Sequence, residues 1–177
     1  RLELTNMTEL DTMYRIMILY MLNKLEYPLT NTQITNFILE KDYTNYFTVQ
    51  QTISDLLSSE LITAESTHNN TRYRITDEGK ETLRFFGDKI SPGIKKDISD
   101  YFEEHHFELK KETSSFADFF KASGSGYQVR CQIKNLEETV LDLTLHVATR
   151  EQALAVCDNW QKQKDEVYAL LMDNLLK

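Results

Sequence analysis

A helix followed by a β-hairpin, over residues 48–76, is the feature that most constrains the fold of this chain. Its sequence is TVQQTISDLLSSELITAESTHNNTRYRIT. Thr48 with Gln51 three residues later forms a capping-box pattern, which predicts the start of the helix. Two β-like segments follow, over 61–66 and 72–76, with the turn-forming residues 68–71 between them. The apolar residues of the helix lie on one face, at i, i+4, i+7, i+8 and i+12: Val49, Ile53, Leu56, Leu57 and Leu61.

The other side of this helix is polar. Gln, Ser and Thr side chains contact base edges and phosphates in DNA complexes. A carboxylate such as Asp55 repels phosphate, and the helix contains no Lys or Arg. Two interpretations remain open: a weakly charged helix that reads DNA, or a solvated helix in a domain that binds protein. The candidate residues are Thr48, Gln51 and Ser58 opposite the apolar stripe, with Asp55, and Gln50, Ser54 and Ser59 on the flanks.

Basic residues gather in and after the hairpin. Arg72 and Arg74 alternate with Tyr73 and Ile75, so both arginines are predicted on one face of the second strand. Lys80 and Arg84 follow one turn apart on the next helix. These four residues, with Asn70 in the turn, are the candidates for contact with phosphates or the minor groove. The alternative is a basic edge that discourages strand pairing with another chain.

Two further helices are predicted before this stretch. The first covers 8–26 with Thr8 as its N-cap, and it is apolar on almost all sides. One side would pack on its own domain and another would meet a second chain; the alternative is the central helix of a monomeric domain. The second helix covers 30–41, begins with a Thr30–Gln33 capping box, and has a short apolar stripe: Ile34, Phe37 and Ile38.

The order of these elements, with ITDEG at 75–79 opening another helix, resembles the winged-helix DNA-binding domain, nearest to the PadR-like and MarR-like bacterial regulators. The most specific phrases are LLSSELI at 56–62 and RYRITDEG at 72–79. The whole chain also resembles an uncharacterised family of winged-helix proteins from Gram-positive anaerobes. The resemblance implies a DNA-binding domain over 1–90. It also implies a transcriptional regulator whose third helix enters the major groove of double-stranded DNA, supported by the second helix. A homodimer would suit a palindromic operator.

The second half of the chain has a different hydrophobic period. Ser91-Pro92-Gly93 predicts a boundary, followed by a linker helix within 91–109. Beyond Leu109, 116–120 is a short aromatic strand candidate, and apolar residues alternate over 127–133 and 141–147. A helix then starts at Arg150 with Thr149 and Gln152 as its capping residues. We therefore predict an α+β chain whose residues 110–177 form an antiparallel β-β-β-α domain, for dimerisation or small-molecule sensing. No effector is identified by the sequence.

The remaining composition limits the function classes. The net charge of −8 means that DNA would be bound through a small local patch, if at all. Cys131 and Cys157 do not form a disulfide framework, and the four histidines have no metal-ligand or catalytic spacing. We therefore expect no enzyme, no cofactor and no metal. No apolar run reaches the roughly 18 residues that span a membrane, and no signal peptide is evident, so a cytoplasmic location is expected.

Overall fold

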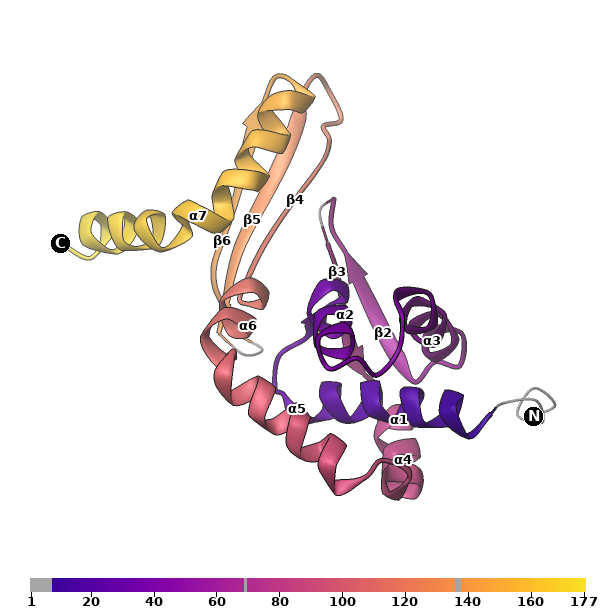
Figure 1. The fold of residues 1–177 in the computed structure, drawn as a ribbon. Coiled ribbons are helices and arrows are strands. Elements are labelled where there is room, and N and C mark those ends of the chain that lie inside the picture. The colour runs from indigo at the N-terminus through magenta and orange to yellow at the C-terminus, as the bar shows by residue number, and fades with distance from the viewer. Residues whose placement is uncertain (1–7, 69, 136–137) are drawn as a thin grey trace. The chain divides into compact units, whose positions relative to one another are not determined.

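The structure is a computed structural model that describes residues 8–68, 70–135 and 138–177. It is an α+β chain with two three-stranded antiparallel sheets (Figure 1). The chain divides into two compact units: Arg1–Ser66 with Asn70–Leu109, and Thr67–Asn69 with Lys110–Lys177. None of the helices in the described part of the chain has the length and apolar character needed to cross a membrane.

The first unit contains most of the helices. Its elements are α1 (Glu9–Lys24), β1 (Leu29–Thr30), α2 (Asn31–Glu40), α3 (Tyr46–Ser58), β2 (Ile62–Ser66), β3 (Thr71–Ile75), α4 (Asp77–Phe86), the 3-10 turn Gly87–Lys89 and α5 (Pro92–Glu104). Helix α6 (His106–Thr113) crosses the division. The second unit is formed by β4 (Ser115–Lys121), β5 (Tyr127–Asn135), β6 (Glu138–Val147) and α7 (Arg150–Leu175).

Helix starts follow the capping residues. Thr8, Thr30 and Thr149 are the N-caps of α1, α2 and α7, as predicted. The predicted start of α3 at Thr48 is wrong. Asn45 is the N-cap: its Oδ1 accepts a hydrogen bond from the Thr48 backbone N–H at 3.0 Å, and the helix begins at Tyr46. Asn is one of the strongest N-caps, so it competes successfully with the threonine three residues later.

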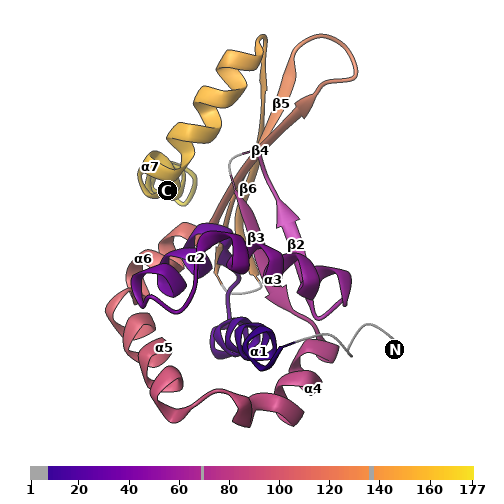
Figure 2. The ribbon, with the colours of Figure 1, turned by 45° about the vertical axis from the view of Figure 1, so that its right-hand side comes forward.

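Helix α1 is the centre of the first unit. Its buried side chains lie on several sides of the helix, which packs against α3, α4 and β3 (Figure 2). They are Ile16, Met17, Ile18, Leu19, Met21 and Leu22. The apolar residues on almost all sides of α1, which suggested contact with a second chain, are therefore buried by other elements of the same unit.

The small sheet of the first unit has the order β1-β3-β2. Leu29 and Ala64 flank Tyr73 on its two sides, and Thr63 lies opposite Arg74. The β2–β3 hairpin was predicted within a residue of its bounds, although Asn69 in its turn lies outside the described residues. Strand β1 was not predicted, because a segment of two residues is too short to show the alternation of apolar and polar residues that indicates a strand.

The linker helix predicted within 91–109 is two helices, α5 and α6, and α5 is not a free linker. Ile94, Ile98, Tyr101 and Phe102 are buried in the core of the first unit. The His105 ring stacks on Tyr101 with a centroid distance of 4.1 Å. These residues fill the same core as Phe37, so the first unit extends beyond the Ser91-Pro92-Gly93 break.

The second unit is an antiparallel sheet of order β4-β5-β6 with α7 packed on one face. Residues 136–137, between β5 and β6 in sequence, lie outside the described residues. Trp160 is buried in this core, and its Nε1 donates to the Gln132 carbonyl at 3.2 Å.

Burial raises the pKa of the Cys131 thiol to about 11 and that of Cys157 to about 12, so both free thiols stay protonated at neutral pH.

Candidate nucleic-acid interface

The exposed face of α3 is the candidate interface. It runs along the helix at i, i+4, i+7 and i+11, opposite the buried stripe that contains Val49 and Ile53. We call it the α3 face and define it by four exposed residues: Phe47, Gln51, Ser54 and Ser58. Three of the four were predicted. Phe47 was missed because the helix was expected to start after it; the signal that would have found it is Asn45, at N-cap spacing from Thr48.

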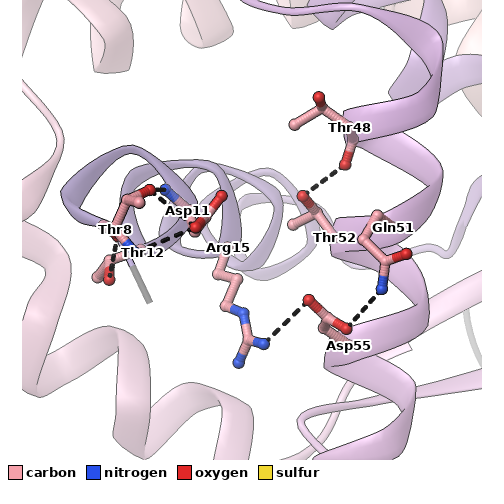
Figure 3. A network of polar contacts seen from close by, with 8 residues as sticks. All are labelled: Thr8, Asp11, Thr12, Arg15, Thr48, Gln51, Thr52 and Asp55. Atoms are coloured by element: carbon pink, nitrogen blue, oxygen red, sulfur yellow. Dashed lines mark hydrogen bonds and ion pairs between the residues drawn. The ribbon is translucent and has the colours of Figure 1, made fainter. Parts of the chain in front are cut away.

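Asp55, which was expected to repel phosphate, is compensated within the first unit. Arg15 reaches from α1 to α3, and its guanidinium lies 3.1 Å from Asp55 Oδ2 (Figure 3). Gln51 Nε2 donates to the other carboxylate oxygen, Oδ1, at 2.9 Å. The carboxylate therefore lies beside a cation at the edge of the α3 face. Asp55→Asn would therefore remove the Arg15 ion pair, and it would not remove an uncompensated negative charge from the α3 face.

Gln50 was predicted to contact DNA, but its amide is occupied. Its Nε2 donates to Asn31 Oδ1 at 3.0 Å and to Thr35 Oγ1 at 3.1 Å, and its Oε1 accepts from Asn31 Nδ2 at 2.8 Å. Asn31 Nδ2 also donates to the Tyr73 hydroxyl at 3.1 Å. This network joins α2, α3 and β3, so Gln50 fixes the orientation of α3 and does not project from the α3 face. Thr48, also predicted, is half-buried, and its backbone carbonyl accepts from Thr52 Oγ1 at 2.7 Å (Figure 3).

The arginines of β3 differ in exposure. Arg72 is only 4% exposed, so its predicted role as a surface contact to phosphate is wrong. It lies between Thr30 of β1 and Glu65 of β2, and a central strand position favours burial of the long side chain. Arg74 is half-buried opposite the exposed Thr63, and Asn70 is half-buried just before β3. Of the two hairpin arginines, Arg74 is therefore the one that retains a surface position.

The basic residues of α4 are not brought together with α3. Both are exposed, but Lys80 Nζ lies 3.6 Å from Asp77 and the Arg84 guanidinium lies 2.6 Å from Glu81. Helix α4 lies across α1 from α3, as both ribbon views show (Figures 1 and 2). Lys80 and Arg84 were grouped with Arg74 because they follow it closely in sequence, and the intervening central helix separates them from the α3 face.

Residues 14–175 match the family model described as Domain of unknown function (DUF4364). The chain belongs to the DUF4364 family. The match runs through both compact units of this DUF4364 protein. No curated protein and no solved structure matches it. Within the residues that the structure describes, no three His, Cys, Asp or Glu side chains are grouped closely enough to hold a metal ion.

Proposed function

We propose that this DUF4364 protein is a DNA-binding transcriptional regulator whose first unit is a winged-helix domain. In this proposal α3 enters the major groove, α2 supports it, and the β2–β3 hairpin is the wing. The observation that carries the proposal is the α3 face: it is exposed, uncharged and rich in hydrogen-bonding groups, while the single carboxylate of α3, Asp55, is paired with Arg15. The order of helices and strands in the first unit supports the same assignment.

The test is binding of the purified protein to a promoter fragment from its own locus, across a salt series from 50 to 200 mM. We expect Arg74→Ala to flatten the slope of log K against log salt by about 0.9, because one phosphate contact is lost. The matched control is the double variant Lys80→Ala with Arg84→Ala, which should leave the slope unchanged because α4 lies across α1 from α3. A flatter slope only in the control variant would place the phosphate contacts on α4.

The second candidate function is a protein-interaction module. It is favoured by the exposed aromatic residues at the end of α4, where Phe85 is 67% exposed and Phe86 is 47% exposed. Exposed apolar groups of this kind mark protein contacts, and the net charge of −8 favours a basic partner. Failure of the protein to bind DNA at the lowest salt concentration would make this function the better account.

We further propose a homodimer, with the last turns of α7 as the contact. Ala153, Cys157, Trp160 and Lys164 form the buried stripe of α7, but the end of the helix leaves the sheet (Figure 1). Four large apolar side chains are exposed there: Leu170, Met172, Leu175 and Leu176. Each carries on the order of 100 Å² of apolar surface. Met172, Leu175 and Leu176 share one side of the helix with the half-buried Leu171, and Leu170 lies on the opposite side. Eight such side chains across a two-fold axis approach the roughly 1,000 Å² that a specific interface needs.

Light scattering at tens of micromolar should therefore give twice the 20.8 kDa chain mass. The double variant Leu171→Glu with Leu175→Glu should reduce it to the monomer mass, because two charges on each copy would be buried in the apolar contact. Leu170→Glu places a charge on the opposite side of α7 and should remain dimeric. A monomer mass for the unmodified protein would refute the homodimer.

A further inference from the structure

Phe47 has an exposure that the fold of the first unit does not explain. Its side chain is 84% exposed, the highest value among the large apolar residues that the structure describes. The neighbouring Tyr46 is 54% exposed and meets Phe47 edge-to-face with ring centroids 6.2 Å apart. Neither ring belongs to the core of the first unit. An aromatic ring left in water contributes little to folding, and two such rings side by side offer an apolar contact surface to a partner.

The position of Phe47 on α3 restricts what that partner can be. It is the second residue of α3 and stands at the N-terminal end of the α3 face. The N-terminal residues of a helix that docks in the major groove contact the base edges. If α3 docks as proposed above, on which this inference rests, Phe47 enters the groove one turn ahead of Gln51.

The chemistry of the groove selects the target of the ring. A phenyl ring neither pairs with phosphate nor makes hydrogen bonds to base edges. The major groove exposes one apolar group, the C5 methyl of thymine. Gln51, one turn further along, is of the type that pairs with adenine. We infer that Phe47 reads thymine methyl groups and that the operator carries A·T base pairs where the start of α3 enters the groove.

A protein partner fits this face less well. Aromatic residues that anchor protein interfaces lie at the centre of apolar, fully desolvated patches. Along the α3 face, Phe47 is followed by an amide and two hydroxyl side chains: Gln51, Ser54 and Ser58. This sequence of one apolar group and several hydrogen-bonding groups matches a base-pair edge better than an apolar pocket.

The experiment compares two versions of the promoter fragment, one made with thymidine and one with deoxyuridine in its place. The exchange removes the C5 methyl groups and retains base pairing. We expect the protein to bind the deoxyuridine fragment about fourfold more weakly for each methyl group that Phe47 buries. Phe47→Ala should bind both fragments with the affinity of the unmodified protein for the deoxyuridine fragment. Phe47→Leu, which keeps an apolar side chain, should retain part of the preference.

Phe85→Ala is the matched control, because it removes another exposed phenyl ring from α4. It should keep the full preference for thymidine. Equal affinity of the unmodified protein for the two fragments, or a preference that survives in Phe47→Ala, would overturn the inference while leaving DNA binding intact. Absence of binding to either fragment would overturn the proposed function itself and make a protein the partner of the α3 face. Circular dichroism of Phe47→Ala should match that of the unmodified protein, because the exposed ring packs on no core residue.

Discussion

Phe37→Ala should unfold the first unit at denaturant concentrations at which the second unit remains folded. The Phe37 ring is fully buried and meets Tyr101 edge-on at a centroid distance of 5.1 Å, with Tyr43 at 6.1 Å. Truncation of a buried Phe to Ala costs about 3–5 kcal/mol, because the lost transfer free energy adds to that of the cavity. A loss of this size is a large fraction of the 5–15 kcal/mol that stabilises a typical domain.

The single tryptophan makes the two units separable in one experiment. Trp160 lies in the core of the second unit, so its fluorescence follows that unit, whereas far-UV circular dichroism follows both. In urea, Phe37→Ala should give an early phase in circular dichroism and leave the midpoint of Trp160 fluorescence unchanged. Val129 is a fully buried residue of the second unit. The matched variant Val129→Ala should therefore shift the midpoint of the Trp160 fluorescence transition instead. Equal shifts of both signals in Phe37→Ala would show that the units unfold as one cooperative body.

Local signals in the sequence account for most of the fold. The N-caps Thr8, Thr30 and Thr149 each accept a hydrogen bond from the backbone three residues later, an interaction that depends only on near neighbours. The hairpin follows from the turn-forming residues 68–71 between two β-like segments. The strands of the second unit follow from the alternation of apolar residues, which indicates their partly buried faces. The start of α3 was misplaced because Asn45 and Thr48 are both good N-caps, and sequence alone does not rank them reliably.

The candidate site was harder to predict, because it depends on residues far apart in the chain. Nothing near Asp55 in sequence indicates that Arg15, forty residues earlier, would compensate its charge. Likewise, the amide of Gln50 forms hydrogen bonds with Asn31 and Thr35, which are distant from it in sequence. The two-residue repeat of a strand correctly placed Arg72 and Arg74 on one face, but this repeat does not indicate which other residues cover that face. Tertiary packing therefore decides which polar residues remain available.

Gly79→Ala should destabilise the first unit strongly, although Ala is the better helix former. In an open helix position this change would gain about 1 kcal/mol. A Cβ on Gly79 would instead lie 2.2 Å from the Leu61 carbonyl oxygen and 2.7 Å from Ile75 Cγ1. The carbonyl is held in place, because it accepts the Thr76 backbone N–H at 3.1 Å. Relief of the overlap must separate α4 from the base of the hairpin, at a cost of about 3 kcal/mol, in the range of overpacked cores.

Gly87→Ala provides the matched control for the cost at Gly79. The nearest atom to a Cβ at Gly87 is Leu83 Cδ1 at 3.9 Å, and the backbone φ is −64°. An alanine fits there without strain, so it should stabilise the protein by about 0.4–1 kcal/mol by reducing the freedom of the unfolded chain. Urea unfolding followed by circular dichroism should thus give opposite signs for the two Gly→Ala changes at the ends of one helix. If Gly79→Ala were neutral or stabilising, α4 would not pack closely on Leu61, and the glycine would be no more than a weak point in the helix.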